Sequence, residues 1–421
     1  MTLSERDKKH LWHPLTQHKL YPDHLPIVRA KGSLLYDEEG KTYIDGIASW
    51  YTCMYGHCNE MIATKIKQQI DELDQVVFSG FTHKPAIELS EKLIAILPDN
   101  QQKIFFSDNG STSVDVAIKM TLQYHYNKGE KRSKLIALED AFHGDTFGAM
   151  SVSGLSVYNG PFEDFLITID RIEVPNQNNF EDVYAKFESL VATGEIAAFI
   201  YEPLVQGAAA MKMYDRGFLE RILEIAKKYQ VLTVADEVMT GFGKTGKNFA
   251  SDYMETKPDI ICMSKSLTAG VAPMAITSCT KEVYNSFYDN EIKKGFFHGH
   301  TYSANPLACS AAIAGIELLQ SDHIQQNIEL ITKRHLDFKE VMDKHPKVKS
   351  TRVLGVIFAL DLNIDMKRYG KLRDKLYQFY MKNGVFLRPL GNTIYILPPF
   401  VISEAELKKI YSVIERSLDI V

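Results

Sequence analysis

Two stretches, Val231-Leu-Thr-Val-Ala-Asp236 and Asp259-Ile-Ile-Cys-Met-Ser-Lys265, decide the fold of this 421-residue chain. Each is a short apolar run that ends in a polar residue, which is the pattern of a buried β-strand. In an open α/β sheet, ligands bind beyond the C-terminal ends of such strands. The sequence therefore predicts that Asp236 and Lys265 lie at one edge of a sheet and face a binding site.

Strand-like and helix-like segments alternate on both sides of these stretches. This alternation predicts an α/β fold with a large domain in which helices cover a mostly parallel sheet. The expected strands are 103–106, 134–138, 197–201, 231–235, 260–263 and 274–277, and the expected helices are 112–126 and 217–230.

The two ends of the chain have a different pattern. Residues 32–45 predict a hairpin around a Glu-Gly turn. We expect strands in 353–362 and 384–398, helices at about 367–382 and 403–418, and a long helix from 305 to 320 and onward. Together the ends predict a small α+β domain made of residues 1–50 and 321–421, with the large domain spanning 51–320.

Composition excludes several classes of protein. The net charge of -5 argues against a nucleic-acid or anionic-membrane surface, and no segment has the ~18 apolar residues of a membrane helix. Five scattered cysteines and a charged N-terminus without a signal peptide predict a cytoplasmic protein. Cys53, His57 and Cys58 lack a second ligand cluster, so we expect no metal site.

A lysine and an aspartate at neighbouring strand ends suit pyridoxal phosphate. This cofactor needs an amine for a Schiff base and a carboxylate that keeps its ring nitrogen protonated. We therefore expect Lys265 and Asp236 to be catalytic and to bind the cofactor. Spacing alone leaves a simple ion pair between the two as the alternative.

Other motifs supply the remaining parts of such a site. Gly110 and Ser111 lie between a strand and a helix, where backbone N–H groups bind phosphate, although a plain helix cap is the alternative. Phe142 follows a strand and could stack on a flat ring, and Thr301 could offer a hydroxyl to a phosphate. Arg388 ends a strand at a rigid turn, which suits bidentate binding of a carboxylate. The alternative is a solvated arginine on the surface.

The glycine-rich run Gly241-Phe-Gly-Lys-Thr-Gly-Lys-Asn248 matches a nucleotide-binding loop only in its spacing. Asn248 lacks the hydroxyl that a P-loop offers to magnesium, and the run does not lie directly between a strand and a good helix. We interpret it as a loop near the site.

Taken together, the motifs resemble the class III, fold-type I pyridoxal-phosphate aminotransferases over nearly the whole chain. The resemblance is carried by Gly110-Ser111, His143-Gly-Asp-Thr146, Asp236-Glu-Val with Thr240-Gly-Phe-Gly243, and Ser264-Lys265. It extends to Leu11-Trp-His-Pro14, Ser49-Trp-Tyr51, Glu202-Pro203, Val205-Gln-Gly207, Phe297-His-Gly-His-Thr301, Asn305-Pro-Leu-Ala-Cys309, Arg388-Pro-Leu-Gly391 and Pro398-Pro399.

The resemblance implies a role for each matching residue. Lys265 would bind the cofactor and carry the proton, and Asp236 would pair with the ring nitrogen. The cofactor site would also include Gly110, Ser111, Phe142, Glu202, His300 and Thr301. The substrate site would include Leu15, Trp50, Phe142, Lys265, Gly299 and Arg388. Thr301 would reach the cofactor of a neighbouring subunit, which implies a homodimer.

Within the class, the strings outside the cofactor site resemble the branch that converts 8-amino-7-oxononanoate to 7,8-diaminononanoate in biotin biosynthesis. Two departures bear on its amino donor, because many relatives have tyrosine where this chain has Leu15 and Phe142. S-adenosylmethionine is the expected donor and lysine the alternative. Another class III ω-aminotransferase, or a binding protein without catalysis, are the other hypotheses.

Overall fold

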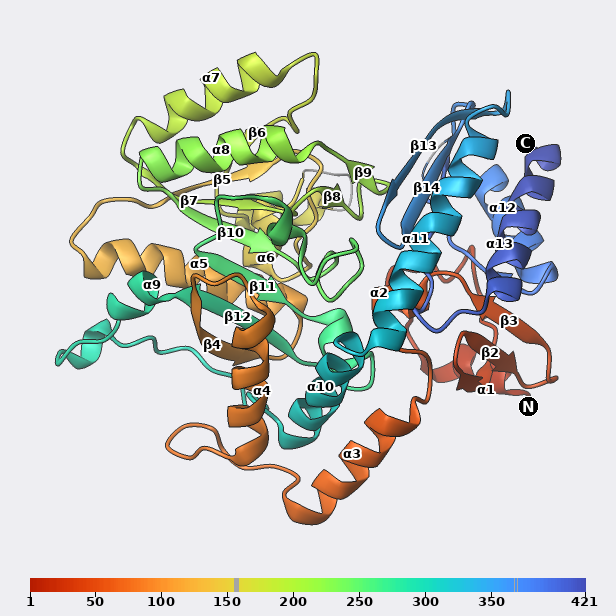
Figure 1. Cartoon of the computed structure of the whole chain (residues 1–421), viewed down its shortest axis with the longest axis horizontal. Helices are drawn as coiled ribbons and strands as arrows, with labels where there is room; N and C mark the ends of the chain where they lie inside the picture. The colour runs from red at the N-terminus through yellow and green to blue at the C-terminus, as the bar shows by residue number, and fades with distance from the viewer. Residues whose placement is uncertain (155–158, 367, 369) are drawn as a thin grey trace.

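The centre of the computed structural model is a seven-stranded sheet, and residues 1–154, 159–366, 368 and 370–421 are described (Figure 1). The four neighbour pairs formed by β11, β10, β7, β5 and β6 are all parallel, whereas β12 is antiparallel to both β11 and β4. In spatial order the strands are β4 (Gln101–Ser107), β12 (Ala275–Thr280), β11 (Ile260–Met263), β10 (Leu232–Asp236), β7 (Ile196–Tyr201), β5 (Lys134–Leu138) and β6 (Asp170–Ile172).

Helices cover both faces of this sheet and separate two hydrophobic cores. Alternate residues of one strand enter different cores: Phe199 packs in the larger and Ile200 in the smaller. Helix α8 (Arg216–Lys228) shows why the sequence folds this way, since Asp215 caps its first turn and the apolar residues at 219, 222, 223 and 226 are all buried. The predicted α/β class with a mostly parallel sheet is confirmed.

The two ends of the chain lie together beside this sheet (Figure 1). The predicted hairpin is confirmed as β2 (Leu34–Asp37) and β3 (Thr42–Asp45), and β1 (Ile27–Lys31) extends it. From the C-terminal end, β15 (Val385–Phe386) pairs with β3 in parallel. The chain ends therefore share one sheet, while the exact domain boundaries stay a prediction.

Three expectations about the C-terminal third were wrong in detail. The segment 353–362 belongs to two strands, β13 (Val348–Leu354) and β14 (Ile357–Leu362), which turn at Gly355 with φ 57°. The segment 384–398 divides between β15 and β16 (Thr393–Ile396), which lie in different sheets. The long helix ends at Leu319, because Ser321 caps a second helix.

The helical expectations otherwise match the structure, although Lys367 lies outside the described residues. The helices in the C-terminal part are α10 (Pro306–Leu319), α11 (Asp322–Met342), α12 (Lys371–Lys382) and α13 (Glu404–Ser417). The others are α1 (Leu3–His10), α2 (Ala48–Tyr51), α3 (Glu60–Glu72), α4 (Lys84–Ile96), α5 (Gly110–Asn127), α6 (Phe147–Val152), α7 (Phe180–Val191) and α9 (Lys281–Asn285). Short 3-10 turns are η1 (Gly160–Phe165), η2 (Ala250–Tyr253), η3 (Lys265–Thr268), η4 (Ile292–Lys294) and η5 (Leu418–Ile420), and β8 (Val205–Gln206) pairs with β9 (Lys212–Met213).

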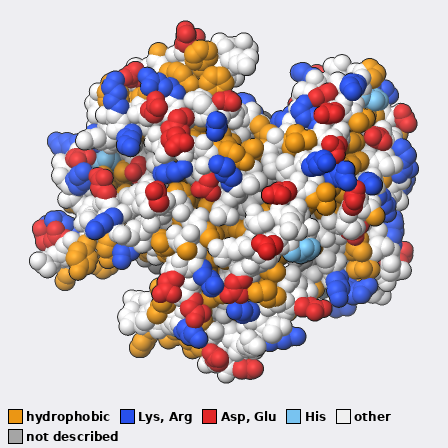
Figure 2. All heavy atoms as spheres, viewed as in Figure 1, with side chains coloured by type: hydrophobic (Ala, Val, Ile, Leu, Met, Phe, Trp, Pro, Cys, Tyr) orange, Lys and Arg blue, Asp and Glu red, His pale blue; other side chains and the backbone are white. Residues whose placement is uncertain are grey.

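Charged side chains of both signs are intermixed on the face shown in Figure 2. Among the described residues, no helix combines the length and the apolar character that a membrane crossing needs.

Candidate active site

Lys265 and Asp236 follow neighbouring parallel strands at the same edge of the central sheet. Asp236 is the last residue of β10 and is in register with Cys262 of β11, and Lys265 comes two residues after β11 ends. The backbone at Lys265 has a φ of 49°, so the chain turns sharply into η3 at this point. Helix α10 packs against this turn at Gly315, where a Cβ would lie 3.4 Å from the carbonyl oxygen of Leu267. The predicted strand-end placement is confirmed.

The carboxylate of Asp236 is buried and held from two sides. Its Oδ2 lies 2.7 Å from Nδ1 of His143, and its Oδ1 accepts a hydrogen bond from the backbone N–H of Val238. Burial opposes the charged form of His143, but the hydrogen bond to Asp236 and the negative charges of Asp236 and Glu202 together outweigh burial and raise the pKa of the imidazole. Nε2 of His143 is a buried nitrogen without a hydrogen-bond partner among the described residues. The Asp236 carboxylate is therefore held in one orientation by the His143 imidazole and the Val238 backbone.

The amine of Lys265 lies in a desolvated environment. Burial lowers its pKa, and the negative charges of Asp236 and Glu202 partly offset that effect. The Nζ atom lies 5.0 Å from the centre of the Tyr51 ring. A lysine with a lowered pKa is more often neutral, which is the state in which it acts as a nucleophile or a base.

Glu202 connects the centre of the site to Phe142. Its Oε2 accepts a hydrogen bond of 3.0 Å from the backbone N–H of Phe142, and its Oε1 accepts one of 3.1 Å from Gly207. Burial raises the pKa of Glu202 to about 7. Phe142 is 46% exposed, which leaves it accessible to a flat ligand.

The loop before α5 has the form of an anion cradle. A Cβ at Gly110 would come within 2.8 Å of Val238, so the backbone there approaches the end of β10 closely. The cap of α5 is Asn109, whose side chain accepts from Thr112, rather than any residue from 111 to 113. Ser111 instead accepts a hydrogen bond from the backbone N–H of Asp145. The first turn of a long helix directs backbone N–H groups and the positive end of its dipole toward this loop, which favours a phosphate there.

Arg388 is brought to the site by the pairing of the chain ends. Its guanidinium lies 4.8 Å from the centre of the Trp50 ring, which is the spacing of a cation–π contact. Next to Trp50, the hydroxyl of Tyr51 donates to that of Tyr395 at 3.1 Å. Arg388, Trp50 and Tyr51 thus form one wall that ends at Lys265, and sequence alone gave no sign that Tyr395 belongs to it.

Four predicted site residues lie apart from this group. Leu15 is 66% exposed, and Gly299 and Thr301 are also exposed. His300 lies half-buried, with its Nδ1 3.3 Å from Asp108 in the loop before α5. Among the described residues, no hydrogen bond or ion pair joins these four to Lys265 or Asp236. Their predicted roles stay predictions.

The glycine-rich run 241–248 lies beside the lysine, as expected. Lys244 is fully buried, and its Nζ donates to Ser266 and, at 2.7 Å, to the carbonyl of Gly241. Burial lowers the pKa of Lys244 well below its usual range. The loop therefore packs under η3 and supports the position of Lys265.

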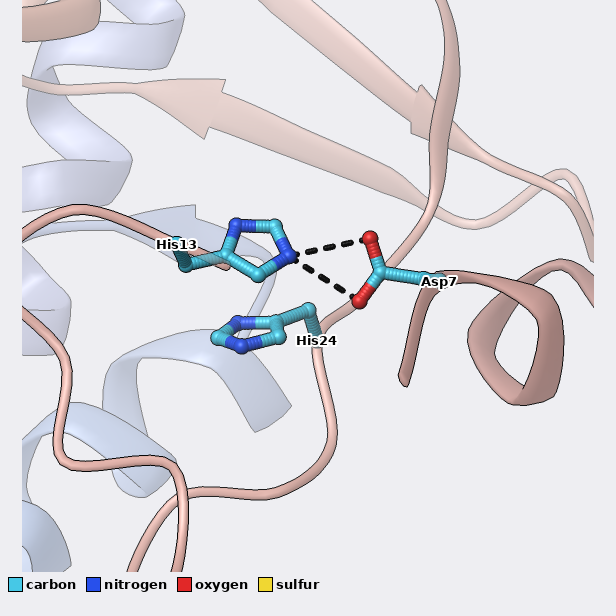
Figure 3. Close-up of side chains that lie close together, drawn as sticks. All are labelled: Asp7, His13 and His24. Atoms are coloured by element: carbon cyan, nitrogen blue, oxygen red, sulfur yellow. Dashed lines mark hydrogen bonds and ion pairs between the residues drawn. The ribbon is translucent and has the colours of Figure 1, made fainter. Parts of the chain in front are cut away.

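A cluster at the N-terminus groups residue types that bind metals (Figure 3). Ligand atoms of Asp7, His13 and His24 lie within 4.8 Å of one another. Nε2 of His13 is 2.9 and 3.0 Å from the two carboxylate oxygens of Asp7, and the His24 ring lies against His13 with centroids 3.7 Å apart and the ring planes tilted by 34°. These contacts join α1 to the segment that carries Leu15. The expectation of no metal site was made without this cluster and stays a prediction.

Comparisons with known proteins agree with the geometry. The family described as aminotransferase class-III matches residues 16–418. An adenosylmethionine-8-amino-7-oxononanoate aminotransferase of Synechococcus elongatus is 43% identical over 97% of this chain and 98% of its own length. The resemblance inferred from the motifs is confirmed.

Two solved structures superpose on nearly the whole chain. The adenosylmethionine-8-amino-7-oxononanoate aminotransferase of Methanocaldococcus jannaschii is 33% identical with a TM-score of 0.94, covering 99% of this chain and 98% of its own. An omega transaminase of Pseudomonas jessenii, in complex with PMP, has the same TM-score at 27% identity, covering 100% and 98%. The fold is therefore shared by enzymes with different names, and sequence separates them better than shape.

Proposed function

This chain belongs to the class III aminotransferases, and on that premise we propose that it uses pyridoxal phosphate to convert 8-amino-7-oxononanoate to 7,8-diaminononanoate. The observation that carries the substrate assignment is the 43% identity, over the full length, to a relative named for this reaction. The equal superposition of an omega transaminase supports the chemistry but not the choice of substrate. The intact Lys265–Asp236 centre argues against a binding protein without catalysis.

The residues at the strand ends fit the cofactor. Asp236 and its neighbour His143 would hold the ring nitrogen, Phe142 would cover the ring, and Gly110 and Ser111 would hold the phosphate. The orphaned nitrogen of His143 and the tight backbone at Gly110 support this fit. When bound, pyridoxal phosphate supplies an aldehyde that takes up amines and a ring that withdraws electrons from the substrate carbon.

Three side chains would divide the chemical work. Lys265 would take the proton from the donor carbon and return it later, and its lowered pKa makes the neutral, basic form easier to reach. Asp236 keeps a proton on the ring nitrogen by its negative charge, and the bond from His143 holds that carboxylate in place. Glu202 holds the Phe142 backbone and so orients its ring.

Arg388 and Trp50 would recognise the substrate. A carboxylate at the far end of the substrate would pair with the Arg388 guanidinium, and the Trp50 ring beneath it would line the apolar chain.

A homodimer would complete the site. Thr301 and Gly299 are exposed on the surface of one chain, which suits contact with a second copy. Thr301 of one subunit would then bind the cofactor phosphate of the other.

The amino donor is proposed as S-adenosylmethionine, after the name of the relatives, with lysine as the alternative. Leu15 and Phe142 remove two phenol hydroxyls that many relatives have, each worth about 0.5–1.5 kcal/mol as a hydrogen bond. Purified enzyme is mixed with each donor separately, and conversion of bound cofactor to its amine form is followed by absorbance. Conversion by lysine alone would reverse the donor assignment.

Product formation tests the reaction itself. Enzyme whose bound cofactor is in the amine form is mixed with 8-amino-7-oxononanoate, and the 7,8-diaminononanoate formed is measured by mass spectrometry. Pyruvate and a simple ω-keto acid serve as controls. A faster single turnover with either control than with 8-amino-7-oxononanoate would assign the chain to a different class III reaction.

A further inference from the structure

The segment from 48 to 51 has a backbone that its sequence does not favour. Ala48, Ser49, Trp50 and Tyr51 have φ values of 46°, 46°, 65° and 69°, and none of them is glycine. A left-handed helical turn brings Cβ close to the following carbonyl oxygen, so each such residue is strained. Four in succession require contacts elsewhere that hold the turn in this form.

One buried carboxylate makes contacts on both sides of this turn. Asp45, the last residue of β3, is fully buried. Its Oδ2 accepts a hydrogen bond of 2.7 Å from the Ser49 hydroxyl and lies 2.9 Å from Nε2 of His57. Its Oδ1 accepts from the backbone N–H of Ile47 at 3.3 Å. Asp45 therefore binds the residue before the turn, a residue inside it and a residue after it.

His57 is itself fixed to the β-sheet of the chain ends. Its backbone N–H donates to Gly32 at 2.8 Å, and its carbonyl accepts from the Gly32 N–H at 3.0 Å. Burial opposes the charged imidazole, but hydrogen bonding and electrostatic attraction to Asp45 and Cys53 together outweigh it and raise the pKa of His57 to about 10. Asp45 and His57 thus form an ion pair at neutral pH, anchored at both ends of the turn.

The turn presents two rings to the active site. Trp50 lies under the guanidinium of Arg388, and Tyr51 lies beside the amine of Lys265. The Tyr51 hydroxyl also reaches Tyr395 of β16. A relaxed, right-handed backbone at 48–51 would point both rings elsewhere, because the direction of each Cβ depends on φ and ψ.

We propose that Asp45, Ser49 and His57 are positioning residues that hold the strained turn 48–51, so that Trp50 and Tyr51 form the substrate wall beside Arg388. The part concerning substrate rests on the function proposed above. The competing explanation is that the ion pair stabilises the fold in general and has no specific effect on the turn. The two explanations differ in one respect: only strain is relieved when glycine replaces a residue at positive φ.

The experiment follows Trp50 directly in the cofactor-loaded enzyme. Trp12→Phe leaves Trp50 as the single tryptophan, since the chain has only two. In that background, Asp45→Asn and His57→Gln should shift the emission maximum of Trp50 and raise the KM for 8-amino-7-oxononanoate about tenfold, with a smaller change in kcat. Ser49→Ala removes one hydrogen bond and should change the Trp50 emission and the KM in the same direction, to about a third of that extent. This variant keeps the test informative if Asp45→Asn and His57→Gln do not fold.

A matched control comes from the neighbouring hairpin. Asp37 is a buried aspartate that accepts hydrogen bonds from the backbone of Glu39 and Lys41 and from the Tyr43 hydroxyl, away from the turn. Asp37→Asn should lower stability while the emission of Trp50 and the KM stay at the reference values. Equal kinetic effects of Asp37→Asn and Asp45→Asn would overturn the proposal in favour of general destabilisation.

Rescue by glycine decides the matter. Ala48→Gly added to Asp45→Asn should recover at least half of the lost kcat/KM and return the Trp50 emission toward the reference, while Ala48→Gly alone should change either by less than twofold. Additive damage in the double variant, or unchanged emission in Asp45→Asn and His57→Gln, would refute the positioning role. If the reference enzyme itself does not act on 8-amino-7-oxononanoate, the substrate assignment fails, and the emission and its rescue still test the turn.

Discussion

The centre of the site and its rim differ in how completely one chain builds them. The centre, formed by Asp236, His143, Glu202 and Lys265, lies within one chain: Asp236 pairs with His143 and raises the pKa of the imidazole, while burial raises the pKa of Glu202 and lowers that of Lys265. The rim, formed by Leu15 and residues 299–301, is largely exposed and makes no hydrogen bond to the centre among the described residues. The contrast fits the proposed homodimer, in which one chain would supply the proton chemistry and a second copy would finish the binding surface.

The largest effect is expected in the centre. Lys265→Ala removes both the amine that takes up the cofactor and the base that moves the proton, so kcat should fall by at least about 10⁴-fold. Steady-state turnover measures the loss, and circular dichroism checks that the fold is intact. Near-normal turnover in a folded variant would remove Lys265 from the mechanism.

Asp236→Asn tests whether the centre acts through its charge. A neutral amide cannot keep the ring nitrogen protonated, and the expected loss in kcat is about 10²–10³-fold with cofactor still bound. Rates and the absorbance of bound cofactor are measured together. A variant that keeps its cofactor and most of its rate would make Asp236 a structural residue only.

Arg388→Ala tests the wall between centre and rim. Loss of the bidentate partner for the substrate carboxylate should lower kcat/KM for 8-amino-7-oxononanoate by about 2–5 kcal/mol equivalent. Arg388→Lys is the control, because it keeps the charge but not the paired geometry, and it should recover only part of the loss. An unaltered kcat/KM in the alanine variant would place this arginine outside the substrate site.

Thr301→Ala tests whether the rim acts across subunits. Alone, the substitution should weaken cofactor binding about tenfold, since it removes one hydrogen bond to an anion. Mixing it with Lys265→Ala should restore activity, because some dimers then contain one site with both lesions and one with neither. Absence of recovery, with subunit exchange shown by mass spectrometry, would count against the shared site.

The smallest effect is a dependence of stability on pH in the centre. Glu202 has a pKa of about 7 in the fold, against an ordinary value of 4.5, so the folded state binds this proton more tightly. The stability it contributes is complete below pH 4.5 and is lost as the pH rises through 7. Urea unfolding measures this effect in the cofactor-free enzyme. Between pH 5 and 8, the free energy of unfolding of the wild type should fall by about 1–3 kcal/mol more than that of Glu202→Gln.

The wild type must be compared with Glu202→Gln because the charges of His143 and Asp236 also act on the Glu202 carboxyl group. Thr301→Ala, a rim variant, should keep the wild-type slope. A slope shared by all three proteins would show that other groups govern the pH dependence.

Local patterns were enough to locate the strands and the chemistry at their ends. Apolar runs such as 231–235 and 260–263 are short and continuous because both faces of the sheet are covered, so their type and bounds follow from composition. The edge of such a sheet then brings Asp236 and Lys265 together without further information. The break of the long helix at Ser321 was missed, because a cap is a weak signal inside a continuous apolar pattern.

By itself, the sequence determined the class of fold, the placement of the lysine and aspartate at neighbouring strand ends, and the loop at Gly110 between a strand and a helix, since these depend on period, residue type and the direction of parallel strands. Only the tertiary structure decided which residues support them. His143 meets Asp236 across 93 positions, and Tyr51 meets Tyr395 across 344. The left-handed turn 48–51 contains no glycine, so its sequence does not indicate positive φ angles. The contacts around it are tertiary ones: Asp45 meets Ser49 and His57, and the backbone of His57 pairs with Gly32, and no local propensity encodes that arrangement.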